Sequence, residues 1–175
     1  TRKGMLDAVH LLRYLIDNGI DGHLTFSGET GSEEFKYKLV TEIKAANLQD
    51  KVTFYRMLSQ EDLITLYHQS DICFFPSYQE MGFSRTPLEA MACGCLVISY
   101  GNEGSDEILQ HGVNGFIVQP DEFQHIVNLI RNLISRPNKI RKVIKYAREE
   151  IEKGYSQNLY LEQIEAYLQG SISYV

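Results

Sequence analysis

The residues best suited to chemistry in this 175-residue sequence lie together near its middle. A polar loop there carries Glu80, Ser84 and Arg85, and a predicted short helix that follows it carries Glu89. The first N–H groups of a helix have no partner within the helix, so they offer a binding site for an anion. A loop and helix of this composition therefore favour a phosphorylated ligand.

Glu89 has two competing interpretations. Thr86 is a good helix cap, and Pro87 would then lie in the first turn. Glu89 would stand where the glutamate of a capping box returns to the N–H of the cap residue. In the alternative, its carboxylate accepts a pair of ligand hydroxyls. One carboxylate cannot satisfy both partners with full geometry, and the local spacing favours the capping box.

Helices and strands alternate along the rest of the chain. Short apolar runs predict strands at 23–27, 51–55, 71–75, 95–99 and 116–118. Apolar residues at helical spacing predict helices at 6–16, 32–46, 59–67, 86–93, 120–133, 140–153 and 158–169, with a further short helix ending near 108. This order predicts an α/β fold with a Rossmann-like, doubly wound parallel sheet that has helices on both faces.

We expect one domain over residues 1–170, followed by a tail at 171–175. The first predicted helix has no strand before it, so its βα unit is incomplete at the front. We therefore expect the chain to be part of a longer protein.

Two further positions have the residue types of a phosphate site. Gly28 opens a glycine-rich turn directly after a predicted strand, where the backbone can approach a phosphate or ribose closely. The turn is not G-x-G-x-x-G, so the dinucleotide fingerprint is missing, and a plain connection is equally compatible. Lys3 offers a point charge for a diphosphate or, alternatively, lies in solvent.

Composition excludes several other functions. The formal net charge is −6, which argues against nucleic acid as a partner. The sequence has no apolar run of membrane-spanning length. Cys73, Cys93 and Cys95 lie in apolar contexts that favour buried thiols, and no spacing of Cys and His predicts a metal site. Motifs for nucleophilic catalysis are absent, and the five histidines are scattered.

Several blocks of the sequence, taken in order, resemble the C-terminal half of the group 1 (family 4) retaining glycosyltransferases. The blocks lie at 3–4, 28, 52–54, 71–77, 87–94 and 113–118, and Leu-Glu-Ala-Met-Ala-Cys-Gly at 88–94 is the most specific. The family has the GT-B fold, in which two Rossmann-like domains face each other across a cleft. The resemblance covers about residues 1–170.

The resemblance implies that this domain binds a nucleoside diphosphate sugar, such as a UDP-, GDP- or dTDP-sugar. It places Lys3 at the diphosphate, Arg56 and Met57 at the base, and Glu89 at the ribose hydroxyls. Backbone N–H groups of residues 84–86 would face the phosphates and the sugar. The donor-binding residues implied in this way are Lys3, Gly28, Arg56, Met57, Phe83, Ser84, Thr86 and Glu89.

One departure concerns the carboxylate that contacts the donor sugar in the family. The family pattern is Glu, seven residues, Glu, but counting back from Glu89 leads to Met81 rather than Glu80. Either the loop has an extra residue and Glu80 performs the role, or Met81 replaces the carboxylate. Arg85 stands where the family usually has an apolar residue, and it either reaches the diphosphate or faces solvent. Glu80 and Arg85 are our candidates for the catalytic residues.

The implied reaction is retaining transfer of a sugar to a saccharide or lipid-linked acceptor held by an N-terminal domain outside this sequence. We expect no metal or cofactor, no transfer by this chain alone, and a role such as polysaccharide biosynthesis. The expected location is the cytoplasm, with peripheral attachment to the inner membrane through the missing half. The alternatives are a non-catalytic module that binds nucleotide sugars and a flavodoxin-like interaction domain.

Overall fold

A computed structural model describes residues 3–78, 84–102, 104–105, 107–155, 159, 161 and 164–166 of the chain. The described strands are all parallel and fall into two sheets. The first sheet pairs β1 (Leu24–Ser27) with β2 (Val52–Tyr55), and the second has the order β3 (Ile72–Phe75), β4 (Leu96–Ser99), β5 (Phe116–Ile117). All of these strands lie where apolar runs predicted them.

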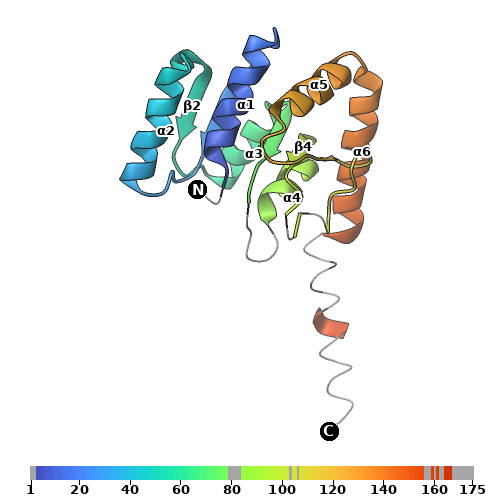
Figure 1. The fold of residues 1–175 in the computed structure, drawn as a ribbon. Coiled ribbons are helices and arrows are strands. Elements are labelled where there is room, and N and C mark those ends of the chain that lie inside the picture. The colour runs from blue at the N-terminus through green and yellow to red at the C-terminus, as the bar shows by residue number, and fades with distance from the viewer. Residues whose placement is uncertain are drawn as a thin grey trace.

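The helices connect these strands and cover them (Figure 1). They are α1 (Met5–Asp17), α2 (Glu33–Ala45), α3 (Gln60–His68), α4 (Arg85–Ala92), α5 (Phe123–Ile134) and α6 (Pro137–Gly154), with a 3-10 turn at Gln49–Lys51. Two predicted helix starts are confirmed by their caps. The hydroxyl of Ser32 accepts a hydrogen bond from the N–H of Phe35 at 3.2 Å, and that of Ser59 accepts one from Asp62 at 3.1 Å.

Strand β4 is covered on both faces. Leu96 and Ile98 pack in a core with residues of α1, α5 and α6, while Val97 packs in a second core with residues of α4 and α6. All four residues of β4 are buried. Helices on both faces of a parallel sheet confirm the predicted α/β fold class.

The β1–β2 sheet has a third core. Leu24, Phe26 and Val52 pack there against apolar residues of α1 and α2. Helix α3, which connects β2 to β3, has no buried residue. This part of the molecule is therefore covered mainly from one side.

The predicted sheet was continuous, whereas among the described residues it is in two parts. Helix α1 begins beside the carboxyl end of β3, because a Cβ on Gly4 would lie 2.0 Å from the carbonyl oxygen of Pro76. The same helix leads into β1. Helix α1 thus lies between the two sheets in the order of contacts, and among the described residues no strand pairing joins β1 or β2 to β3.

One predicted helix is contradicted by the structure, and another lies mostly outside the described residues. The predicted short helix ending near 108 is wrong, since the described residues at 104–105 and 107–108 form turns, with Gly104 at a φ of 95°. Most of the predicted helix at 158–169 and the tail at 171–175 lie outside the described residues. None of the helices in the described part is long and apolar enough to cross a membrane.

Candidate functional site

Helix α4 begins two residues earlier than the sequence predicted. Ser84 is its N-cap, with an extended backbone (φ −83°, ψ 129°), so Thr86 is the second helical residue and not the cap. Pro87 still lies in the first turn, where its missing N–H costs no helical hydrogen bond. The Ser84 side chain makes no capping hydrogen bond in the structure. The start of a helix suits an anion, because its first N–H groups have no partner within the helix.

This start of α4 also excludes the capping box for Glu89. Glu89 is the fifth residue of the helix, too far along to return to the cap N–H. Its carboxylate Oε2 instead accepts a hydrogen bond from the phenol of Tyr67, at 3.4 Å. Burial raises the pKa of Tyr67, and the neighbouring Cys73 and Glu89 add to the effect, so the phenol remains a donor. A carboxylate has further acceptor positions, which leaves Glu89 able to bind hydroxyls.

Lys3 lies at the carboxyl end of β3. Its ammonium is 5.7 Å from the centre of the Phe75 ring, at the last residue of that strand. The next residue, Gly4, has a φ of 60° and is buried against Pro76, where a side chain would collide with the backbone. This contact fixes the start of α1, and with it Lys3, beside the strand end. The position suits the predicted role at a diphosphate.

The candidates for base binding gather at the carboxyl ends of β1 and β2. The N–H of Gly28 donates to the carbonyl of Tyr55 at 3.2 Å, which holds the two strand ends together. Arg56 follows directly and is exposed, and Met57 is 83% exposed. A Cβ on Gly28 would meet nothing within 4 Å, so the turn is open to solvent.

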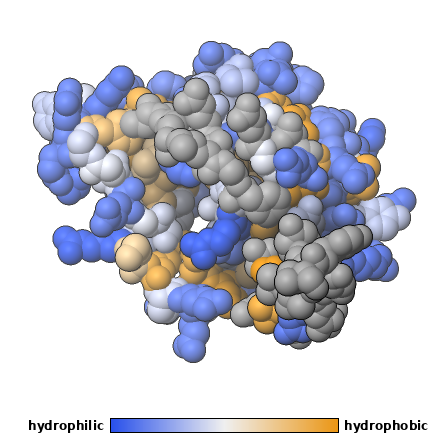
Figure 2. Space-filling view, turned by 90° about the horizontal axis from the view of Figure 1, so that it is seen from below, coloured by the Kyte–Doolittle hydropathy of each residue, from blue (hydrophilic) through white to orange (hydrophobic). Residues whose placement is uncertain are grey.

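The described candidates therefore form two groups at the carboxyl ends of the strands. One group lies at β1 and β2, and the other lies at β3 and the start of α4, with Glu89 one turn deeper. Arg85 is exposed at the first position of α4. Figure 2 shows this face from below, with hydrophilic side chains around smaller apolar areas. Glu80, Met81 and Phe83 lie outside the described residues, so their predicted roles stay predictions.

Sequence reasoning missed one network at the same edge. Tyr78 and Tyr100 both donate hydrogen bonds from their phenols to Oδ2 of Asp7, at 2.5 and 2.7 Å. These partners are 71 and 93 residues apart in the chain, so no local pattern joins them. Tyr67 was missed for the same reason, since its partner Glu89 is 22 residues away.

The sequence predicted three buried thiols; Cys95 is buried, whereas Cys73 and Cys93 are half-buried. Their surroundings disfavour the thiolate in all three. Burial raises the pKa of Cys73, and it raises that of Cys95 to about 12. Cys93 has a raised pKa too, because burial and the carboxylate of Glu89 both disfavour its thiolate. Among the described residues, no group of His, Cys, Asp and Glu is arranged to hold a metal ion.

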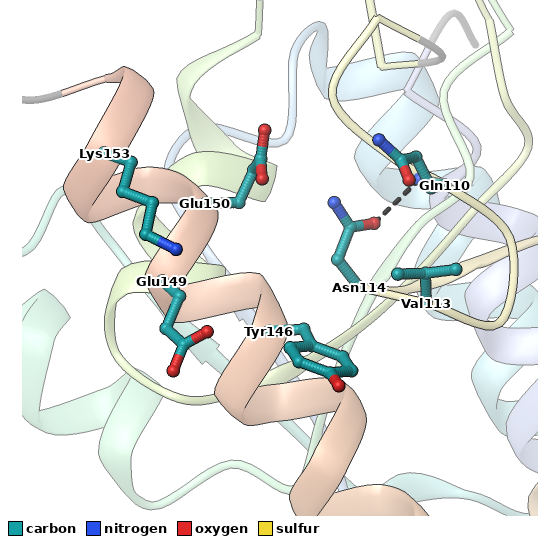
Figure 3. Close-up of a pocket in the computed structure, with 7 residues that line it drawn as sticks. All are labelled: Gln110, Val113, Asn114, Tyr146, Glu149, Glu150 and Lys153. Atoms are coloured by element: carbon teal, nitrogen blue, oxygen red, sulfur yellow. Dashed lines mark hydrogen bonds between the residues drawn. The ribbon is translucent and has the colours of Figure 1, made fainter.

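A pocket of about 230 Å³ lies between α6 and the loop before β5, and none of the candidate donor residues lines it (Figure 3). Tyr146, Glu149, Glu150 and Lys153 come from α6, and Gln110, Val113 and Asn114 come from the loop. The Oδ1 of Asn114 accepts a hydrogen bond from the N–H of Gln110 at 2.7 Å. Its amide group donates to the carbonyl of Ile108 at 2.9 Å, so buried Asn114 shapes the loop.

Comparison with known proteins gives a consistent result. A sequence model of the family described as glycosyl transferases group 1 matches residues 1–150. The human alpha-1,3/1,6-mannosyltransferase ALG2 is 29% identical over 136 residues, which is 77% of this chain and 32% of that protein.

Solved structures agree with the sequence match. A glycosyltransferase from Rickettsia africae ESF-5 superposes with a TM-score of 0.89 at 25% identity, over 100% of this chain and 46% of the other. Anabaena Alr3699/HepE in complex with UDP superposes with a TM-score of 0.82 at 24% identity, over 92% of this chain and 44% of the other. The chain thus spans less than half the length of these three proteins.

Proposed function

Because the chain belongs to the group 1 glycosyl transferases, we propose that it binds the nucleoside diphosphate sugar donor for retaining transfer of a hexose. In this proposal an N-terminal domain outside the sequence holds a saccharide or lipid-linked acceptor. The solved Anabaena HepE structures contain UDP and UDP-glucose. A uridine nucleotide is therefore the first donor to test here.

The observation that carries the proposal is the arrangement at the carboxyl end of β3. There the start of α4, where the Ser84 side chain makes no capping bond, and the ammonium of Lys3 both supply positive potential at one edge of a parallel sheet. Ligands of open α/β sheets bind at this edge. Backbone N–H groups and a lysine are together suited to a diphosphate, since each hydrogen bond to a charged group contributes about 1.5–3 kcal/mol.

The proposed chemistry assigns each group a role. Lys3 and the first N–H groups of α4 hold the diphosphate and stabilise the charge that develops on it as the sugar leaves. Glu89 accepts the ribose hydroxyls, while Arg56 and Met57 lie beside the base. We retain Glu80 as the carboxylate that contacts the donor sugar, and Arg85 as a second cation for the diphosphate.

The test is a calorimetric titration of the protein with UDP, GDP, dTDP and ADP, repeated on Glu89→Ala. We expect selective binding of one nucleotide, weakened by about 1.5 kcal/mol or more, or at least about tenfold, in Glu89→Ala. Glu42→Ala is the matched control, because Glu42 is a glutamate in the last turn of α2, at the opposite end of that helix from the turn at Gly28. Binding of none of the four nucleotides by the folded protein would overturn the proposal.

A non-catalytic module that binds nucleotide sugars is the second candidate, favoured by the shifted position of Glu80. We expect no glycosyl transfer by this chain alone, so the distinction requires the chain joined to an acceptor domain. Glu80→Gln in that longer protein separates the two: a large loss of transfer with donor binding retained supports catalysis. Unchanged transfer would remove Glu80 from the catalytic residues.

A further inference from the structure

We propose that Asp7 is a positioning residue for the donor diphosphate, acting through the ends of β3 and β4 and through the first turn of α1. This inference rests on the proposed function, since it concerns the same site. Asp7 itself is not placed against the donor.

The carboxylate of Asp7 joins three segments that are distant in the chain. Its Oδ2 accepts one hydrogen bond from Tyr78, three residues beyond β3, and another from Tyr100, the first residue after β4. The two phenol rings meet edge to face, with centres 5.4 Å apart. Tyr100 also meets Phe74 of β3 edge to face at 5.7 Å and is only 6% exposed.

A second set of contacts reinforces the same three segments. The side-chain amide of Asn102 donates to the carbonyl of Ser77, and the hydroxyl of Ser105 donates to Oδ1 of Asn102 at 2.9 Å. On the other side, Gly4 packs directly on Pro76. The start of α1 and the ends of β3 and β4 are thus linked by side-chain and backbone contacts on both sides of Asp7.

Asp7 is negatively charged, so it cannot assist a diphosphate by electrostatic attraction. Asp7 lies one turn of α1 beyond Lys3, and its negative charge repels a diphosphate. Its position in the first turn is favourable for the helix dipole, and two phenol donors satisfy it with charge-assisted hydrogen bonds. Its benefit to a diphosphate site therefore comes from geometry, because it ties the segment that carries Lys3 to the end of β3.

The phenols are suited to this role over the whole neutral range. Burial and the hydrogen bond to Asp7 raise the pKa of Tyr78 to about 12, with a smaller contribution from Asp121. Burial, the hydrogen bond to Asp7 and the charges of Asp7 and Asp121 likewise raise the pKa of Tyr100. Both tyrosines therefore remain protonated donors throughout the neutral range.

The experiment compares the wild-type protein with Asp7→Asn and Tyr78→Phe. The probes are the nucleoside diphosphate among UDP, GDP, dTDP and ADP that the wild type binds most tightly, and the corresponding nucleoside. We expect the diphosphate to bind about tenfold more weakly to Asp7→Asn, and the nucleoside within about twofold of wild type. Asp17→Asn is the matched control, because Asp17 lies at the far end of α1 in an exposed ion pair with Arg13.

Two further measurements separate positioning from a general loss of structure. Lys3→Ala combined with Asp7→Asn should weaken binding less than the product of the two single effects, because Asp7 acts partly through Lys3. Tyr78→Phe removes one hydroxyl from a side chain that is 44% exposed, so it tests the link even if Asp7→Asn does not fold.

The outcomes distinguish this inference from the proposed function. If the wild type binds none of the four nucleotides, both are overturned. If the wild type binds but Asp7→Asn and Tyr78→Phe bind the diphosphate equally well, only the positioning role is overturned. An equal loss of diphosphate and nucleoside affinity would also overturn it, since a merely structural role predicts that result.

Discussion

The two sheets of this molecule differ in how completely they are covered. Every residue of β4 is buried, and both faces of its sheet contact helices. None of the residues of β1 or β2 is fully buried, and Phe54 and Tyr55 are 42% and 46% exposed. The strands have the same length, but β1 alternates apolar residues with Thr and Ser, whereas β4 has three apolar residues in succession, as a strand covered on both faces requires.

The candidate donor site has the same division. At the carboxyl end of β3 the backbone is held by a close contact, that of Gly4 on Pro76. At β1 and β2 the turn at Gly28 is open, and Met57 extends into solvent. Under the proposed function, the fixed strand end would hold the phosphates and supply binding energy common to all donors, and the open strand ends would hold the base. The open strand ends can vary between relatives without disturbing the core.

The largest effect that tests this comparison should come from the cores. Phe116 is 1% exposed in β5, so Phe116→Ala should destabilise the protein by about 3–5 kcal/mol, from lost burial and the cavity left behind. Phe54→Ala in β2 should cost no more than about half of that, because much of the ring is already in water. Urea unfolding of both variants measures the difference, and equal losses would contradict the distinction between the sheets.

A smaller effect should separate two glycines with positive φ. Alanine at Gly28, where φ is 107°, should cost about 1–3 kcal/mol from backbone strain alone, since no atom lies within 4 Å of the new Cβ. Alanine at Gly4 adds a collision with the Pro76 carbonyl, so the cost should be clearly greater. The same urea unfolding experiment compares the two variants. A smaller loss at Gly4 would show that the start of α1 moves freely from β3.

The order of elements could be predicted from sequence because it follows from local patterns. Apolar periodicity and caps such as Ser59 place α3 and its neighbours without knowledge of the fold. The division into two sheets could not be predicted this way, because whether β1 pairs with β3 depends on residues that are distant in the sequence. Likewise, Thr86 has the chemistry of a cap, but the structure makes Ser84 the cap, with an extended backbone that no local pattern indicates.

The candidate site was predictable to the same extent. Lys3, Gly28 and the start of α4 follow strand ends or begin helices, and the fold brings them to one edge of the sheets. Partners that depend on packing were not predictable, which is why Tyr67 and Asp7 were missed. Glu89 shows what local spacing cannot decide: the spacing favoured a capping box with Thr86, and the structure excludes it.

A modest loss of stability should follow when the hydrogen bond between Tyr67 of α3 and Glu89 of α4 is removed. Helix α3 has no buried residue, so this bond is one of its specific contacts with the better-packed half. Tyr67→Phe should lower the free energy of unfolding by about 0.5–1.5 kcal/mol, nearer the lower value because the bond is 3.4 Å long. Tyr37→Phe, at a tyrosine 77% exposed on α2, is the control and should leave stability unchanged.

The smallest effect should appear only at alkaline pH, and it tests whether protonated phenols hold the end of β3. The folded-state pKa of Tyr78, about 12, is above the usual value near 10, so the folded protein retains this proton more strongly than the unfolded chain. The contribution to stability is therefore complete below about pH 10 and decreases as the pH rises toward 12. Urea unfolding between pH 8 and pH 11 should show a steeper alkaline loss in wild type than in Tyr78→Phe. If the free energy of unfolding decreased equally with pH in both proteins, the Tyr78 phenol would not be held by Asp7. The hydrogen bond from Tyr78 to Asp7 could then no longer be counted among the contacts that fix the end of β3.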